Sequence, residues 1–339
     1  MADRVTSMRL APGRDRASTP AGRRRTAGWV RRPSQGGQRP SSPGRLLSSG
    51  SIWTMRIGLL VGLAVYVVFG IVPSLANIVV SLTNYSGLAG SSTSFSGLSN
   101  YTAMFTTERP GFISALWITV VFVVGVTVIQ NLFGLMLAHR LQGSRRIDSV
   151  LRILVFLPIV LGVTVVGLIW ILIFDPQQGP ASSLLSAFGS SSAFFGQTGV
   201  ALPLLIGVQI WQNLGFTTLV YIGGLKSIGA DVYEAASLDG VGRWARLRRI
   251  TFPLLAPAMT INVLLAVIGS FTTYNLIYIL TQGQYSTQTL GMLAFNNAFG
   301  LSANLGYGAA VSVALFVLTL IVALPLQQYL RRREWRILS

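Results

Sequence analysis

The polar side chains with the clearest functional spacing are three amides and an aromatic ring inside an apolar stretch. Gln209, Gln212, Asn213 and Phe216 stand at i, i+3, i+4 and i+7, which places them on one face of a helix. Amides in an apolar helix need hydrogen-bonding partners because water is absent there. The face predicts contact with a polar solute, and the alternative is that it ties neighbouring helices together.

A second polar face is predicted in the next apolar stretch. Ser270 and Thr273 follow Gly269 there, and Tyr274 lies beside them. Hydroxyl groups and an aromatic ring complement the amides of the first face. We expect Ser270, Thr273 and Tyr274 to share one cavity with Gln209 and its neighbours.

The composition argues against covalent and metal chemistry. The chain has no cysteine and one histidine, so we expect no thiolate site and no metal site. Its one lysine, Lys226, follows Leu225, so the Gly-Lys-Ser/Thr phosphate loop is missing and this chain cannot hydrolyse ATP. All nine acidic residues fall outside the apolar stretches or at their ends, whereas ion-driven carriers usually place a carboxylate in the membrane. A stand-alone channel or ion-driven secondary carrier remains the alternative to an externally powered transporter.

The overall composition is that of an integral membrane protein. Of 339 residues, 51% are hydrophobic and 10% are charged, against about 25% charged in soluble domains. Six apolar stretches are long enough to cross a bilayer, which takes roughly 20 residues each. The sequence therefore predicts an all-α polytopic fold with six transmembrane helices, near residues 57–82, 112–138, 151–174, 200–222, 254–280 and 307–330.

Basic residues predict the orientation of the six spans. Every arginine and lysine except Arg109 lies before residue 57, in the loops 140–152 and 223–253, or in the C-terminal segment. By the positive-inside rule, both termini and these loops face the cytoplasm. Residues 1–52 are rich in Arg, Ser, Pro and Gly, which predicts a disordered basic cytoplasmic tail ahead of a transmembrane domain at 53–339. A tail that binds lipid headgroups and an organellar transit peptide are the alternatives.

The segment 231–257 interrupts two apolar stretches with polar and basic residues. Asp231 and Glu234 have capping-box spacing, so we expect a short helix to start at Val232 and stop at Gly240. We expect a second helix over 243–250, closed by Pro253, with Trp244 on its apolar side. The sequence thus predicts two short helices at the cytoplasmic surface. Residues 223–257 are called the docking segment below.

Residues of the docking segment carry a resemblance to a known family. Glu234-Ala235-Ala236, Asp239-Gly240, Ile250 and Pro253 stand at the spacing of the EAA loop of ABC importer permeases. Outside this loop, Phe95-Ser96-Gly97-Leu98-Ser99-Asn100-Tyr101 resembles the FxGLxNY segment of sugar-importer permeases, with Ser99 in place of the usual Asp. Further matches are Leu157-Pro158, Trp170, Phe174-Asp175 and Gly179. The resemblance covers about residues 53–336 and is strongest to carbohydrate-uptake permeases of the maltose and glycerol-phosphate type.

This resemblance implies a subunit of a type I ABC importer in a bacterial inner membrane. The implied partners are a second, related permease, two copies of an ABC ATPase and an extracytoplasmic solute-binding protein, with lipid around the spans and no nucleic acid. The resemblance implies that this chain binds no cofactor, because ATP and Mg²⁺ belong to the ATPase. It also implies docking through Glu234, Ala235, Ala236, Asp239, Gly240 and Arg243, and a sugar or sugar-like solute as cargo. Gly229 and 283–285 depart from the family pattern.

Overall fold

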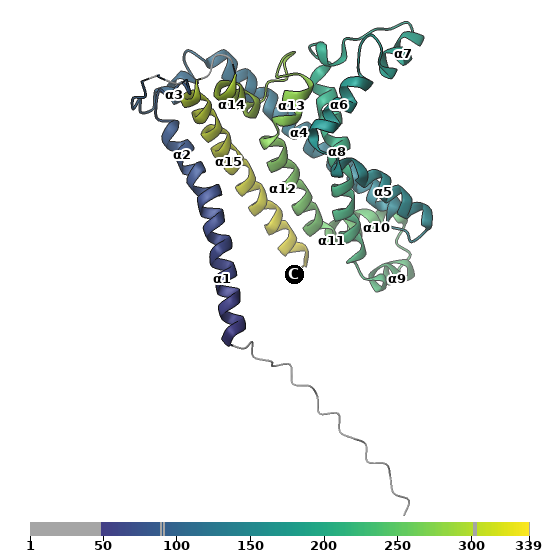
Figure 1. The fold of residues 1–339 in the computed structure, drawn as a ribbon. Helices are drawn as coiled ribbons and strands as arrows, with labels where there is room; N and C mark the ends of the chain where they lie inside the picture. Colours follow the sequence, from purple (N-terminus) through teal and green to yellow (C-terminus); the bar gives the residue numbers. More distant parts are fainter. Residues whose placement is uncertain (1–48, 89, 91, 301–303, 339) are drawn as a thin grey trace, which may run out of the picture. The chain divides into compact units, whose positions relative to one another are not determined.

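The computed structural model describes residues 49–88, 90, 92–300 and 304–338, and it is helical over most of that length (Figure 1). In the described part, β-structure is limited to an isolated bridge between Thr83 and Phe95. The elements are α1 (Ser49–Tyr66), η1 (Val67–Ile71), α2 (Val72–Val80), α3 (Ser99–Ala103), α4 (Arg109–Leu141), α5 (Arg146–Val160), α6 (Val163–Ile173), α7 (Pro180–Ala187), η2 (Phe194–Gly196), α8 (Ala201–Lys226), α9 (Ala230–Leu238), α10 (Arg243–Arg246), η3 (Leu247–Thr251), α11 (Phe252–Leu254), α12 (Ala256–Thr272), α13 (Asn275–Leu280), α14 (Leu290–Phe299) and α15 (Leu305–Leu338).

The chain divides into two compact units, Met1–Leu60 and Val61–Ser339, and all packing described below lies within the second unit. The predicted basic tail lies outside the described residues, except that α1 already begins at Ser49.

Three helices are long and apolar enough to cross a membrane. They are Trp53–Val80, Arg109–Leu141 and Leu305–Glu334, at the places where the first, second and sixth spans were predicted. The count rises to five if two bent helix pairs each form one span. The all-α class is therefore confirmed, with three to five candidate spans in the described part of the chain.

One of the two bent pairs lies where the sequence predicted a single straight span. The stretch 151–174 divides into α5 and α6, which meet at 103° because Leu161 and Gly162 both adopt extended backbone conformations. The helices Arg243–Leu254 and Ala256–Thr272 meet at 68°. This second break lies close to the boundary that the sequence predicted, between a helix closed by Pro253 and a span that starts at residue 254. Hydropathy contains no information on backbone angles, so it did not predict the bend at Leu161 and Gly162.

Helix α8 differs from the other predicted spans in composition. It is 26 residues long, which is enough to cross a bilayer. Its three amides lower its hydropathy, so it is not among the helices that length and composition select. The residues that suggested a functional face are thus the same residues that weaken the membrane-span signal.

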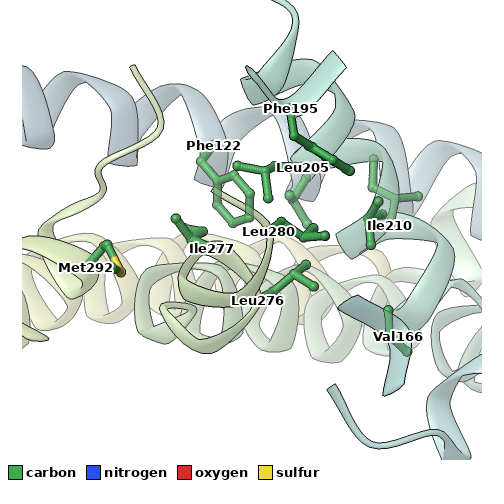
Figure 2. Close-up of a cluster of buried hydrophobic side chains, with 11 residues drawn as sticks. Phe122, Val166, Phe195, Leu205, Ile210, Leu276, Ile277, Leu280 and Met292 are labelled. Atoms are coloured by element: carbon green, nitrogen blue, oxygen red, sulfur yellow. The ribbon is translucent and has the colours of Figure 1, made fainter. Parts of the chain in front are cut away.

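Helices α4, α8, α12 and α15 form the packed centre of the second unit. Helix α4 packs along both α8 and α12, and α12 also packs along α15. Figure 1 shows α13 and α14 at one end of this group and α9 to α11 at the other. One core cluster joins α4 and α8 to the short helices, and its buried side chains are shown in Figure 2: Phe122, Val126, Val166, Phe195, Leu205, Val208, Ile210, Leu276, Ile277, Leu280 and Met292.

Small residues let α8 approach its neighbours closely. A Cβ on Gly215 would lie 2.5 Å from Phe156 Cα in α5, so no larger residue fits without moving a backbone. A Cβ on Gly134 in α4 would lie 2.5 Å from Thr217 Cγ2. Such contacts are typical of helix pairs in membranes, where close packing replaces the hydrophobic effect as the cause of association. They hold the polar face of α8 in a fixed position.

The turn after α6 is organised by Asp175 and Gly179. Asp175 Oδ1 accepts hydrogen bonds from the backbone N–H groups of Gln178 at 2.7 Å and Gln177 at 2.8 Å. These two bonds, with the Gln178 bond the stronger influence, lower the pKa of Asp175 below its ordinary value. A Cβ on Gly179 would lie 2.7 Å from the carbonyl oxygen of Ile173, so glycine is required at this position.

Candidate functional site

Within the docking segment, α9 does not start through the predicted capping box. The N-cap residue is Gly229, no side chain caps the helix, and Asp231 lies inside its first turn. The predicted start at Val232 is therefore wrong by two residues. The reason is that Gly229 adopts an extended conformation, with φ −58° and ψ 145°, so the helix starts at Ala230. The carboxylate of Asp231 still favours the helix, because it lies near the positive end of the helix dipole.

Helix α9 ends at Gly240 as predicted. Gly240 has φ +68°, in the left-handed region that glycine adopts most easily. The backbone N–H of Val241 donates to Ala236 O at 3.0 Å, and that of Gly240 donates to Ser237 O at 3.2 Å. This pair of bonds is a Schellman motif, which satisfies carbonyl groups at the end of the helix. It fixes the direction in which the chain leaves α9.

The second helix of the docking segment is longer than predicted. Helix α10 continues through the π-helical turn η3 into α11, and Pro253 lies in the first turn of α11 instead of closing the element. A first-turn proline is tolerated because its missing N–H would have no partner there. Trp244 was expected on the apolar side, yet 73% of its surface is exposed. That part of the prediction is wrong because Trp244 packs against no core cluster.

Most residues expected to dock are on the surface. Glu234, Ala235, Asp239, Gly240 and Arg243 are exposed, whereas Ala236 is buried against the rest of the fold. Beneath the segment is a cavity of about 580 Å³, lined by His139, Gln142, Leu225, Tyr233, Arg243, Trp244, Arg246, Leu247 and Thr251. The Arg246 guanidinium lies 5.8 Å from the centre of the Tyr233 ring, which links α10 to α9.

A second cavity, of about 270 Å³, lies among the helices of the packed centre, and we call it the central cavity. Helices α4, α5, α8 and α12 supply its walls. Its lining residues are Gln130, Ile159, Gln209, Asn213, Phe216, Thr217, Asn262, Leu265, Ala266, Gly269 and Ser270. No lining side chain carries a formal charge, so this cavity offers neutral hydrogen bonds and apolar contact.

The structure brings together four of the seven predicted pathway residues. Gln209, Asn213 and Phe216 of α8 and Ser270 of α12 all line the central cavity. The sequence spacing therefore identified the face of α8 that is turned toward α12.

The other three predicted pathway residues lie outside the central cavity. The Gln212 amide faces the bend between α5 and α6, where Nε2 is 3.5 Å from Leu161 O. Helix α12 ends at Thr272, so Thr273 and Tyr274 do not continue its face. Thr273 Oγ1 donates to Gly269 O at 2.8 Å. The Tyr274 ring stacks on Phe295, with 5.1 Å between ring centres, beside a different cavity.

Three polar lining residues were missed by the sequence analysis. Gln130 Nε2 donates to Thr217 Oγ1 at 2.7 Å, and Asn262 Nδ2 donates to Thr217 O at 3.1 Å. These bonds join α4, α8 and α12 at one end of the central cavity. Gln130 and Asn262 are single amides in long apolar stretches, and an amide at that depth is itself a signal that partners are nearby. The sequence analysis searched for periodic faces, so it did not register them.

The described residues contain no group of three His, Cys, Asp or Glu side chains that could hold a metal ion. What the site offers is therefore a neutral, amide-lined cavity and, at the other end of α8, an exposed and partly basic surface.

Comparison with known proteins identifies the family. Residues 130–336 match the family described as "Binding-protein-dependent transport system inner membrane component". The Bacillus subtilis (strain 168) "Probable ABC transporter permease protein YurN" is 31% identical over 279 residues, 80% of this chain and 94% of the relative. The Agrobacterium fabrum (strain C58 / ATCC 33970) "Sulfoquinovosyl glycerol transport system permease protein SmoG" is 31% identical over 258 residues, 75% of this chain and 82% of the relative.

A solved structure gives the same fold. A chain of the bacterial alginate ABC transporter, crystallised with a periplasmic protein that holds an alginate pentasaccharide, superposes with a TM-score of 0.68 at 20% identity, covering 84% of this chain and 95% of that one. The fold is therefore that of an ABC importer permease. The family match covers the docking segment and every residue that lines the central cavity. It also decides against the stand-alone channel or carrier. This chain belongs to the binding-protein-dependent transport system inner membrane components, the non-catalytic permease subunits of ABC importers.

Proposed function

We propose that this permease imports a sugar or sugar-like solute through a pathway that includes the central cavity. The observation that carries the proposal is unused hydrogen-bonding capacity in an uncharged cavity. Asn213 Nδ2 donates to Gln209 O at 2.9 Å, which leaves Asn213 Oδ1 without a partner among the described residues. The side-chain amide of Gln209 also has no hydrogen bond within the described chain. Hydroxyl groups of a solute would supply the missing hydrogen-bond partners of both amides.

Three further features support a sugar over other solutes. The cavity contains no charged side chain that would pair with an ionic solute. Phe216 and Leu265 give it apolar walls, which suit the C–H faces of a sugar ring. Its volume is just below the roughly 300–1,000 Å³ typical of ligand pockets, which suits a small solute. The relative that is named for sulfoquinovosyl glycerol transport also supports a sugar-like solute.

The proposal extends to the whole transporter. This chain would cross the inner membrane six times, with both termini in the cytoplasm and with α8, the α5–α6 pair and α12 among its spans. It would assemble with a second permease, two ATPase subunits and an extracytoplasmic binding protein. The exposed residues Glu234 and Asp239, next to the fixed turn at Gly240, would seat in a cleft of one ATPase, where ATP and Mg²⁺ are bound.

The test is solute import by the assembled transporter in liposomes. The probes are radiolabelled glucose, maltose, trehalose, glycerol 3-phosphate and, as a non-sugar, glutamine. We expect import of at least one sugar or sugar-like probe, dependent on ATP and the binding protein. Gln209→Ala and Asn213→Ala should each raise KM by about 2- to 10-fold, because a neutral hydrogen bond contributes roughly 0.5–1.5 kcal/mol.

The matched control is Leu219→Ala on the same helix, because Leu219 is 39% exposed and lines no cavity near the amides. This control should keep the wild-type KM. Import of glutamine alone would contradict the sugar class. If both amide variants keep the wild-type KM, the central cavity is not part of the solute pathway.

A further inference from the structure

Gln130 is a buried amide whose side chain makes one hydrogen bond within the described residues. Its side chain is 5% exposed and its Nε2 donates to Thr217 Oγ1 at 2.7 Å. Within the described residues Oε1 accepts no hydrogen bond, and it is not among the buried polar atoms sealed off by protein. Because Gln130 lines the central cavity, Oε1 is open to that cavity. A buried acceptor without a hydrogen-bond donor costs roughly 1–3 kcal/mol of stability, unless another group donates to it.

Thr217, which accepts the hydrogen bond from Gln130, is itself held in place by two neighbouring helices. Its side chain is 2% exposed, and its methyl group fills the space over Gly134, one turn along α4 from Gln130. Its backbone carbonyl accepts a hydrogen bond from Asn262 Nδ2 of α12. Thr217 is thus packed by α4 and bonded by α12. With one Nε2 hydrogen donated to Thr217 Oγ1, Oε1 of Gln130 is the acceptor that remains available to the cavity.

The position of Gln130 gives it a particular place in the pathway. Thr217 lies one helical turn from Asn213, toward the end of α8 that leads to the docking segment. Gln130 therefore lies at the inner end of the central cavity, beyond Gln209 and Asn213 for a solute that arrives from outside. Helix α4 contributes Gln130, whereas α8 contributes the other two amides.

We propose that Gln130 is a specificity-determining residue, whose Oε1 accepts a hydrogen bond from a solute hydroxyl group while Thr217 holds the amide in that orientation. This inference rests on the proposed function of the central cavity, and it narrows the solute class to molecules with a donor at the inner end. A solute carrying only acceptors there is disfavoured, because two oxygen acceptors would face each other.

The test compares a sugar with its monodeoxy analogues, using the assembled transporter in liposomes. The probe is the radiolabelled sugar that the wild type imports best from the panel above. Gln130→Met keeps the length of the side chain and removes the acceptor, and it should raise KM for the parent sugar by about 3- to 10-fold. One monodeoxy analogue lacks the hydroxyl group that donates to Oε1. For that analogue, wild type and Gln130→Met should have equal KM, because neither can form this hydrogen bond. Leu132→Ala, a 56% exposed position on α4, is the control and should match wild type throughout.

Thr217→Val tests the orientation, because it keeps the shape of the side chain and removes the oxygen that anchors Gln130. In this variant the amide can turn and offer NH₂, so a fluoro substituent replacing the same hydroxyl should be rejected less than by wild type. If Gln130→Met does not assemble, Gln130→Asn, which shortens the reach by one methylene, is expected to show the same loss for one hydroxyl only.

Two results would overturn the inference and leave the proposed function intact. In the first, Gln130→Met raises KM by the same factor for the parent sugar and for every analogue, which indicates a structural role. In the second, Gln130→Met leaves KM unchanged for all of them. If the wild type imports no sugar, the proposed function fails and this inference fails with it.

Discussion

The sharpest test of the docking segment is the substitution of Gly240 by alanine. Gly240 has φ +68°, and a Cβ placed there would meet no atom within 4 Å. Steric clash with neighbours is therefore absent, and the cost is confined to the backbone. For a residue with a Cβ, the left-handed conformation costs roughly 1–2 kcal/mol. That cost lowers the population of the native turn by about 5- to 30-fold.

Gly242 supplies a matched control two residues away. Its φ is −60° with ψ 155°, an extended conformation open to any residue, and a Cβ there also has no atom within 4 Å. Gly242→Ala therefore adds the same methyl group to the same loop without backbone strain. Any general effect of replacing glycine, including reduced freedom of the unfolded chain, is common to both variants.

The assay measures the affinity of the purified permease in nanodiscs for the ATPase that co-purifies with it. Gly240→Ala should weaken binding by about 5- to 30-fold, and Gly242→Ala should bind like wild type. Gly240→Asn should fall between them, because asparagine tolerates the left-handed region better than alanine. Equal binding by all three variants, or equal weakening by the two alanine variants, would refute the argument that the Schellman turn positions the docking surface.

Three other predictions follow from the fold. In intact cells, impermeant labels should reach 281–306 from outside and Arg333 only from the cytoplasm, and labelling of Arg333 from outside would contradict six spans. Gly215→Ala should destabilise the protein by about 1–3 kcal/mol through overpacking against α5, whereas Gly207→Ala, which meets no atom within 4 Å, should not; thermal unfolding in detergent measures both. Because its backbone partners lower the pKa of Asp175, the turn after α6 is stabilised above the ordinary pKa of 3.8 and loses that stability as pH falls through the lowered value. Amide exchange there, corrected for intrinsic rates, should rise at that pH, and an Asp175→Ala variant should lack the pH-dependent step.

The sequence predicted best those features that depend on residue type and short spacing. The uninterrupted helices α4 and α15 follow from apolar length, and the left-handed turn at Gly240 follows from the freedom of glycine. The cavity-facing side of α8 follows from the spacing of its polar residues. In each case, the information lies within one or two helical turns of chain.

Features that depend on distant parts of the chain were not predictable in the same way. Gln130 acquires its orientation from Thr217, which is 87 residues away, and no pattern within α4 indicates that partner. Tyr274 was assigned to the face of α12 on the assumption that the helix continued. The helix stops at Thr272, and the ring then stacks on α14. The bend at Gly162 is equally invisible to hydropathy, because both arms are apolar.

The two candidate regions, the central cavity and the docking segment, are joined by one helix. Helix α8 carries Gln209 and Asn213 in its middle and ends at Lys226, and only residues 227–229 separate it from α9. Hydrogen bonds from Gln130 and Asn262 also tie α8 to α4 and α12 at Thr217, between the solute-facing amides and the docking segment. A displacement of α9 by an ATPase would therefore reach α8 through a three-residue link, and α12 through the continuous path α10–η3–α11. Because Gln130 and Asn262 both bond to Thr217, we expect a movement that passes into α8 either to carry α4, α8 and α12 together or to break the bonds at Thr217. Breaking the bonds at Thr217 would release the Gln130 amide at the inner end of the central cavity. We have proposed that this amide selects the solute by a hydrogen bond, and that bond would then be lost as the solute leaves.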